Sequence, residues 1–130
     1  MERVRAGEVE LATHVRPGGE PTVIGIHGLT ANHTCWYPVA EALAPAHRFV
    51  AYDLRGRGGS DKPERDYNLA AHNRDLLALM GRLGTRRAVI MGHSLGAHIA
   101  VRFAAHHPER VSKLVLVDGG LDAVRGQLKG

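Results

Sequence analysis

The sequence predicts an α/β protein with a three-layer α/β/α arrangement, in which a mostly parallel sheet lies between two layers of helices. From residue 22 onward, short apolar runs alternate with longer helix-compatible stretches, and the joins between them are short. That order is typical of parallel strands linked by crossover helices. The runs are apolar throughout rather than at every second position, as in strands buried on both faces. The expected buried strands span residues 22–26, 48–52, 88–91 and 113–117.

The other elements follow from local patterns along the chain. Residues 8–15 alternate with a period of two and predict a half-exposed strand. A first helix is expected over residues 36–43. A longer amphipathic helix is expected over residues 68–83, and Gly84 ends it. We assign the apolar face of this helix to Leu69, Leu76, Leu77 and Met80.

Length and composition fit a single domain over residues 1–130. The formal net charge is +4, but the basic residues are scattered, so we expect no nucleic-acid partner. A single cysteine, Cys35, cannot form an internal disulfide and fits a reducing compartment. The charged N-terminus is unlike a signal peptide, and no apolar window has the length of a membrane span. We therefore expect a cytoplasmic protein with no membrane partner.

The chemistry centres on the motif G-H-S-L-G at residues 92–96. It follows the buried strand at 88–91 and precedes a stretch of small helix-forming residues at 97–105. A strand that turns into a helix within a few residues strains the residue at the tip and lifts its side chain clear of the backbone. We interpret Ser94 as a nucleophile on this turn. The alternative, that Ser94 only caps the helix, leaves the flanking glycines without a reason.

A carbonyl group attacked by Ser94 becomes an oxyanion, which needs preorganised hydrogen-bond donors. One donor is the backbone N–H of Leu95, at the start of the helix. We expect the second from the backbone N–H of Leu29, because Gly28 lets that loop approach closely. We interpret His27 as a structural residue whose ring holds the loop, in preference to a catalytic base. Neither G-x-G-x-x-G nor G-x-x-x-x-G-K-[ST] occurs, so we expect no phosphate-bearing cofactor and assign neither a cofactor nor a metal.

Four motifs, in this order, resemble the N-terminal part of the α/β-hydrolase family. His27-Gly28 followed by Trp36 resembles the family's oxyanion loop and the tryptophan after it. D-L-R-G-R-G-G-S at residues 53–60 resembles its D-x-R-G-x-G-x-S loop, and residues 92–96 resemble its nucleophile elbow. P-E-R-V ahead of L-V-L-V-D resembles the approach to its sixth strand. The resemblance covers nearly the whole chain.

By this resemblance the chain is an incomplete α/β-hydrolase core, lacking the cap and the last strands. It implies a serine hydrolase for a small-molecule acyl substrate, such as an ester, lactone or thioester. Ser94 argues against the family branches with an aspartate nucleophile, among them the epoxide hydrolases. Family members place an acid and then a histidine after the nucleophile, but His98, His106 and His107 all lie along or beyond the helix, too badly placed to act as the base. Asp118, at a strand end, is a candidate acid, with a turn-capping role as the alternative.

Two interpretations of function therefore stay open. In the first, Ser94 takes up an acyl group and water completes the turnover, although the triad histidine is absent from the sequence. In the second, the chain is an inactive truncated or split fragment that acts only by binding or needs a C-terminal partner. The last strand, from Leu114 to Val117, would then be an apolar edge strand. We expect weak stability, self-association through that edge, or completion by another polypeptide.

Overall fold

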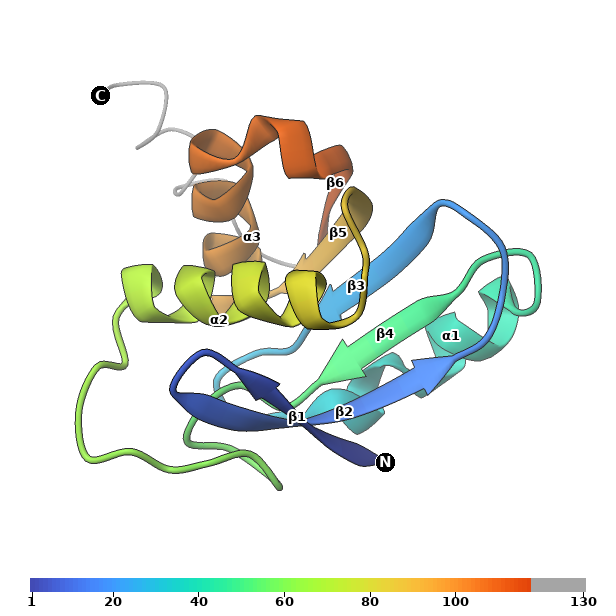
Figure 1. Ribbon diagram of the computed structural model, residues 1–130. Coiled ribbons are helices and arrows are strands. Elements are labelled where there is room, and N and C mark those ends of the chain that lie inside the picture. Colours follow the sequence, from blue (N-terminus) through green and yellow to red (C-terminus); the bar gives the residue numbers. More distant parts are fainter. Residues whose placement is uncertain (118–130) are drawn as a thin grey trace.

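A single sheet organises the part of the chain that the computed structural model describes, residues 1–117. Its strands are Glu2–Ala6 (β1), Val9–Arg16 (β2), Thr22–Ile26 (β3), Phe49–Tyr52 (β4), Ala88–His93 (β5) and Val111–Val117 (β6). They lie in the order β1-β2-β4-β3-β5-β6 (Figure 1). β3 pairs in parallel with β4 and β5, and β5 pairs in parallel with β6, whereas β2 pairs antiparallel with β1 and β4. The sheet is mostly parallel, as the sequence predicts.

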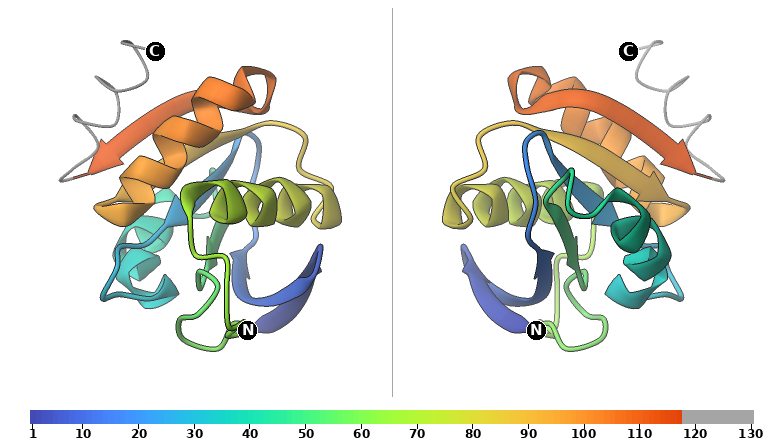
Figure 2. Two further views of the ribbon diagram at one scale, coloured as in Figure 1. Left: turned by 90° about the vertical axis from the view of Figure 1, so that its left-hand side faces the viewer. Right: turned by 90° about the vertical axis from the view of Figure 1, so that its right-hand side faces the viewer.

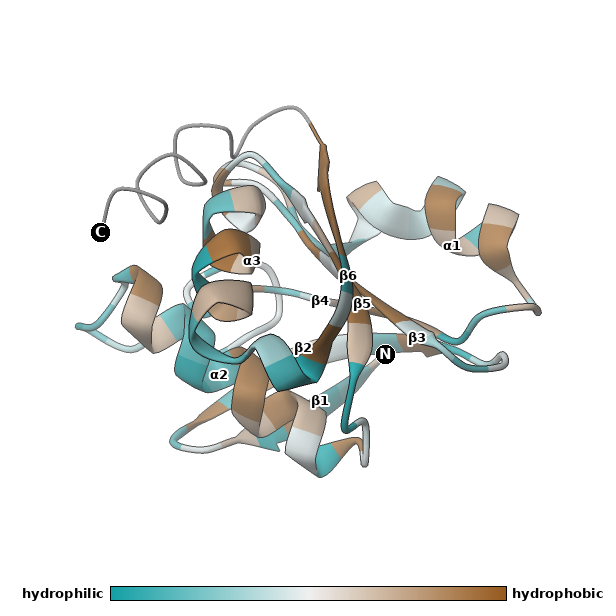
Figure 3. Ribbon diagram, turned by 90° about the horizontal axis from the view of Figure 1, so that it is seen from above, coloured by the Kyte–Doolittle hydropathy of each residue, from teal (hydrophilic) through white to brown (hydrophobic). Residues whose placement is uncertain are grey.

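Helices cover both faces of the sheet, which confirms the three-layer prediction. They are the 3₁₀ turn η1 (His33–Trp36), α1 (Tyr37–Leu43), α2 (Leu69–Arg82), α3 (Leu95–His106) and the 3₁₀ turn η2 (Pro108–Arg110). Figure 3 shows α1 on one side of the sheet and α2 with α3 on the other, and Figure 2 shows these layers from two sides. Within residues 1–117, every helix is too short or too polar to cross a membrane.

Each face of the sheet carries its own hydrophobic core. The core on the α2 and α3 side includes Ile24, Ile26, Val50, Tyr52, Leu76, Leu79 and Phe103. The core on the α1 side consists of Val23, Trp36, Ala40, Phe49 and Ala51, with partly buried neighbours. Successive residues of a strand point to opposite faces. β3 and β4 therefore supply both cores, and this is why their sequences are apolar at every position.

β1 is absent from the sequence-based prediction, because its residues Glu2–Ala6 are mostly charged rather than apolar. Gly7, with φ of 65°, makes the turn that folds β1 back onto β2. Arg3 pairs with Glu10 at 3.1 Å and also binds the carboxylate of Asp61. β1 lies at one edge of the sheet, where charged side chains discourage pairing with other chains.

The apolar face that we predicted for α2 is partly wrong. Leu76 and Met80 are fully buried, but Leu69 and Leu77 are only partly buried, and Leu79 belongs to the buried face instead. The rest of that face consists of Ala71, His72, Asn73 and Asp75. Three of these residues are polar, and a search for apolar periodicity cannot detect a buried polar face.

β6 forms the other edge of the sheet within the described residues. Its residues are intermediate or exposed, in contrast to the uniformly buried β3 and β4. α3 packs against β6, but Val117 is 41% exposed. Apolar side chains and free backbone groups on an edge strand favour pairing with another strand. Self-association through Leu114 to Val117 stays a prediction.

Candidate active site

Ser94 lies at the turn from β5 into α3, as the motif predicts. Its backbone has φ of 55° and ψ of −116°, a conformation that costs a residue with a Cβ about 1–3 kcal/mol. The side chain is exposed and makes no hydrogen bond that caps α3. Instead, the Ser94 carbonyl accepts the Ala97 N–H at 2.9 Å. The Ser94 hydroxyl therefore does not cap α3, and the capping alternative is wrong.

The two glycines of the motif are required by close packing of backbone on backbone. A Cβ on Gly92 would overlap the carbonyl oxygen of Gly96, within the same turn. A Cβ on Gly96 would overlap the carbonyl oxygen of Ile26, at the end of β3. The first glycine keeps the turn tight, and the second lets the start of α3 lie directly on the neighbouring strand. Together they bring Ser94 next to the loop that follows β3.

Gly28, in that loop, lies against the elbow. A Cβ placed on Gly28 would be 3.1 Å from the Cβ of Ser94 and 3.2 Å from Nδ1 of His93. Leu29 follows directly, with its side chain 57% exposed, and Leu95 is the first residue of α3, where backbone N–H groups have no partner within the helix. The structure thus places the loop that contains Leu29 against Ser94, the residue before Leu95. Leu29 and Leu95 are the two expected oxyanion donors. The direction of the Leu29 N–H stays a prediction.

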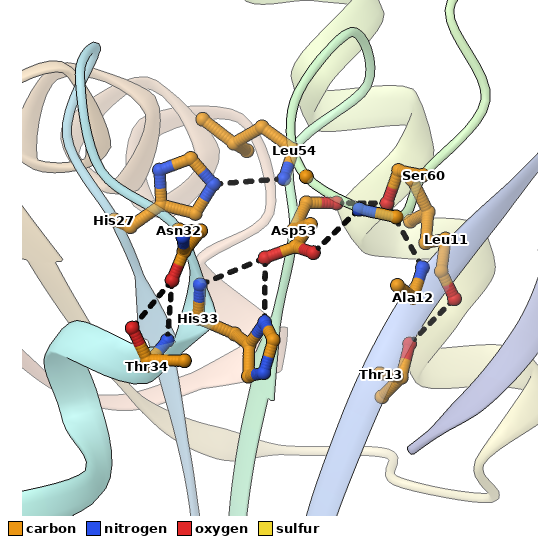
Figure 4. A network of polar contacts seen from close by, with 12 residues as sticks. Leu11, Ala12, Thr13, His27, Asn32, His33, Thr34, Asp53, Leu54 and Ser60 are labelled. Carbon is orange, nitrogen blue, oxygen red and sulfur yellow. Dashed lines mark hydrogen bonds and ion pairs between the residues drawn. The ribbon is translucent and has the colours of Figure 1, made fainter.

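His27 is fully buried and ties the end of β3 to the end of β4. Its Nε2 accepts the backbone N–H of Leu54 at 3.0 Å (Figure 4). Its Nδ1 lies 2.6 Å from the carbonyl oxygen of Gly28. Because Nε2 accepts, Nδ1 carries the proton and donates. Burial lowers the pKa of His27, so the ring stays neutral. One ring nitrogen binds the loop after β3 and the other binds the loop after β4, so the ring joins the two loops.

Trp36 anchors the far end of the same loop. Its indole lies on β3 where Gly25 has no side chain, and a Cβ there would come within 2.6 Å of the ring. The ring also packs on Phe49, with centroids 6.1 Å apart. The loop from His27 to Trp36 is therefore fixed at both ends by buried rings.

Asp53, at the end of β4, is the centre of a polar network that we did not predict. Its Oδ1 accepts the backbone N–H of His33 at 2.8 Å and Nδ1 of the same residue at 2.7 Å, and Oδ2 accepts the N–H of Gly59 at 2.9 Å (Figure 4). Burial raises the pKa of Asp53, but these donors outweigh it and lower the pKa overall. The carboxylate stays ionised and joins two loops. His33 and Asp53 lie 20 positions apart, so no local motif indicates the pair.

Arg55 holds the glycine-rich loop in place through hydrogen bonds to two distant segments. It is 1% exposed, and Nε and Nη2 donate to the two oxygens of Asp75 at 2.7 and 2.8 Å. Nη1 donates to the carbonyl oxygen of Asp66 at 2.9 Å. A cavity of about 400 Å³ lies outside this pair, lined by Glu8, Val9, Arg55, Pro63, Glu64, Arg65 and Asp66. Its lining includes no residue of the elbow.

A smaller apolar pocket of about 220 Å³ lies beside the elbow, lined by Cys35, Trp36, Val39, His93 and Val117.

On α3, the backbone N–H of His98 donates to the Ser94 carbonyl at 3.3 Å, one turn along the helix. His106 ends α3, about 18 Å from its start at 1.5 Å per residue. Asp118, our candidate acid, lies outside the described residues. Within residues 1–117, no group of three or more His, Cys, Asp or Glu residues could hold a metal ion.

Comparison with known proteins matches this geometry to one family. Residues 21–129 match the model of the alpha/beta hydrolase fold. A putative carbamate hydrolase of Caulobacter sp. (strain K31) is 37% identical over 121 residues, covering 89% of this chain and 45% of that protein. A meta-cleavage product hydrolase from Pseudomonas fluorescens IP01 superposes with a TM-score of 0.83 at 27% identity, covering 88% of this chain and 43% of that one. A variant of an epoxide hydrolase from Vigna radiata superposes with a TM-score of 0.87 at 28% identity, covering 91% of this chain and 38% of that one.

The chain therefore belongs to the alpha/beta hydrolase fold family, and its homologues include hydrolases. It spans less than half the length of each of these three relatives.

Proposed function

We propose that this chain carries the nucleophile and the oxyanion-binding backbone of a serine hydrolase. The supporting observation is that Ser94 is an exposed residue on a backbone with φ of 55°, directly before the first turn of α3. A folded protein keeps such backbone strain only where the surrounding structure imposes it, and strain of this kind clusters at functional sites. Here the close backbone packing that Gly92 and Gly96 permit holds the turn tight around Ser94.

In the proposed reaction, Oγ of Ser94 adds to the carbonyl carbon of an ester, lactone, thioester or related acyl substrate. Negative charge develops on the carbonyl oxygen, and the backbone N–H groups of Leu29 and Leu95 stabilise it. A base removes the proton of the hydroxyl and returns it to the leaving group, and water then releases the acyl group. We place this base in the part of the relatives' length that this chain does not span, and Asp118 stays our candidate for the acid that orients it.

A second candidate is a chain that binds but does not turn over substrate, or that acts only with a C-terminal partner. The limited span supports it, because the chain covers 45% of the carbamate hydrolase and 38% of the epoxide hydrolase. Without a base, a serine nucleophile retains only the contribution of binding and the oxyanion hole, which leaves the rate far below that of an intact triad.

A fluorophosphonate probe separates the candidates, because it labels only an activated serine. Ser94→Ala is the negative variant, and Ser112→Ala, which removes another exposed serine, is the matched control. Labelling at Ser94 in the chain alone would show that a base within this chain activates the serine, which supports the nucleophile and overturns our placement of the base. Labelling that requires an added C-terminal half of the Caulobacter relative supports the split enzyme. If Ser94 stays unlabelled with and without that half, the nucleophile proposal is wrong.

A further inference from the structure

Asp53, His33 and Tyr37 are linked by hydrogen bonds in a row. Their carboxylate, imidazole and hydroxyl are the same three kinds of group as in a serine protease triad. Oδ1 of Asp53 lies 2.7 Å from Nδ1 of His33 (Figure 4), and Nε2 of the same ring lies 3.0 Å from the hydroxyl of Tyr37. Carboxylate, imidazole and hydroxyl are thus joined in line. The Tyr37 ring also packs against the His33 ring, with centroids 5.5 Å apart.

The direction of each hydrogen bond follows from the carboxylate. Asp53 is 2% exposed, and its ionised form is stabilised by two backbone N–H groups, so both of its oxygens accept. Nδ1 of His33 must then carry a proton and donate. In the neutral ring, the lone pair of Nε2 is then left to accept the Tyr37 O–H. The carboxylate orients the ring and the ring can take the proton of the hydroxyl, which is the division of roles that activates a nucleophile.

This arrangement is separate from Ser94. The Tyr37 ring packs on His14, in β2, with centroids 5.1 Å apart. In the sheet order, β4 and β3 lie between β2 and β5, so β2 is about 14 Å from β5 at the usual strand spacing of about 4.8 Å. Nε2 of His33 therefore faces the β2 side of the sheet rather than the elbow. It does not supply the base that Ser94 needs.

We propose that Tyr37 is a second nucleophile, activated by Asp53 and His33, that accepts acyl groups from activated acyl donors such as acylimidazoles. The phenolic oxygen attacks the acyl carbon, a new C–O bond forms, and the bond from carbon to the leaving nitrogen breaks. The proton passes from Tyr37 to Nε2 of His33 and then to the departing imidazole. The products are an O-acyl tyrosine and free imidazole. Tyr37 is 41% exposed, so a donor in solution can reach it.

The chain contains its own reference for this reaction. Tyr67 is also 41% exposed, but its hydroxyl donates to the backbone carbonyl of Pro63, which cannot take the proton. Tyr52 is fully buried and should not react. The experiment treats the intact chain with N-acetylimidazole and follows acetylation of each tyrosine by peptide mass spectrometry. General-base assistance typically contributes about 10²–10⁴-fold, so we expect Tyr37 to react at least about tenfold faster than Tyr67.

Three variants test the assignment of the base. His33→Phe keeps a ring against Tyr37 but removes the base, and it should slow Tyr37 to the rate of Tyr67 while Tyr67 itself is unchanged. His33→Gln, which keeps a polar side chain, should do the same and serves if the first variant does not fold. His14→Phe should leave the rate of Tyr37 unchanged, because His14 contacts its ring without a role in the relay.

The Ser94→Ala variant should acetylate at Tyr37 as the parent chain does, so failure of this proposal and of the serine hydrolase proposal are distinguishable. Equal rates at Tyr37 and Tyr67 overturn the inference. So does an acetyl group found on His33 in place of Tyr37, or a Tyr37 rate that both His33 variants leave intact.

Discussion

The two helices on one face of the sheet, α2 and α3, bury opposite kinds of side chain. The buried residues of α3 are all small or apolar, namely Gly96, Ala97, Ile99, Ala100, Val101 and Phe103. The buried face of α2 includes His72, Asn73 and Asp75 beside its apolar residues. The helices also touch through polar groups, since Nδ2 of Asn73 donates to the carbonyl oxygen of Ile99 at 3.1 Å.

This difference matches what each helix positions. α3 places the elbow, and it does so by bringing Gly96 directly onto the backbone of β3. α2 places the glycine-rich loop, and it does so through the ion pair between Asp75 and Arg55. A closely packed contact tolerates no added atom, and a buried charge tolerates no lost partner. Different kinds of substitution on the two helices should therefore lower the free energy of unfolding.

The largest effect is expected at the buried ion pair. Asp75→Asn removes the charge at nearly constant shape and leaves the Arg55 guanidinium, 1% exposed, with only the exposed carboxylate of Glu8, 3.6 Å from Nη2, as a counter-ion. Loss of one partner of a buried pair costs about 3–5 kcal/mol, so urea unfolding should show a fall of about 4 kcal/mol in the free energy of unfolding. The double variant Arg55→Met with Asp75→Leu should recover most of that loss. A fall under about 1 kcal/mol for the single variant would mean that the pair is not buried in solution.

The corresponding test on α3 adds a single Cβ atom at its closest contact with the sheet. Gly96→Ala places a Cβ on the carbonyl oxygen of Ile26, so the helix start must move away from β3. We expect a loss of about 3 kcal/mol in thermal or urea unfolding, at the upper end of overpacking effects. Gly81→Ala is the control, because Gly81 lies in α2 with nothing within 4 Å of its Cβ position. It should stabilise the chain by about 0.5–1 kcal/mol. Equal effects of the two variants would show that close packing does not set the elbow.

The same contrast separates what the sequence predicts from what it does not. The elbow is predictable, because a buried strand, two glycines and a helix of small residues are contiguous at 88–105. The contact between Asp53 and His33 is not, because only the parallel pairing of β3 with β4 brings their loops together. Local patterns thus encode the fold and the turn that carries Ser94.

The polar face of α2 shows the other limit of sequence reasoning. Apolar periodicity assigned Leu69 and Leu77 to the core, whereas His72 and Asp75 are more deeply buried. An aspartate such as Asp75 on a helix face is normally exposed, and its burial depends on a partner from a distant segment. That partner, Arg55, lies in a loop that the helix contacts only in the folded state.

The pH dependence of stability sharpens the comparison at His72. Burial, then the nearby Arg57, Arg55 and His27, lowers the pKa of His72 from 6.5 to about 4. Within residues 1–117 neither ring nitrogen has a hydrogen-bond partner. Between pH 6.5 and 4 the unfolded chain therefore binds a proton that the folded chain does not, so stability falls as the pH falls through this window and the effect is absent above it.

The variant His72→Leu isolates this effect, because other groups titrate equally in both proteins. Between pH 7.5 and 5 the parent chain should lose about 2 kcal/mol of unfolding free energy relative to the variant. Urea unfolding at several pH values measures the difference. Parallel pH profiles for the two proteins would show that His72 is solvated in the folded state.

The smallest expected effect on stability is at Ser94, at the tip of the elbow, where a substitution should stabilise the chain rather than destabilise it. Ser94 adopts φ of 55° and ψ of −116°, which strains any residue with a Cβ. Ser94→Gly relieves that strain, and after the added entropy of glycine in the unfolded chain we expect a gain of about 1 kcal/mol. Ser94→Ala keeps the Cβ and should give no such gain, although both variants lose the hydroxyl and any labelling by fluorophosphonate. Backbone strain at Ser94 supports our proposal that this residue is a nucleophile. Equal stability of the two variants would show that the turn stores no strain and would remove this support for a nucleophile at Ser94.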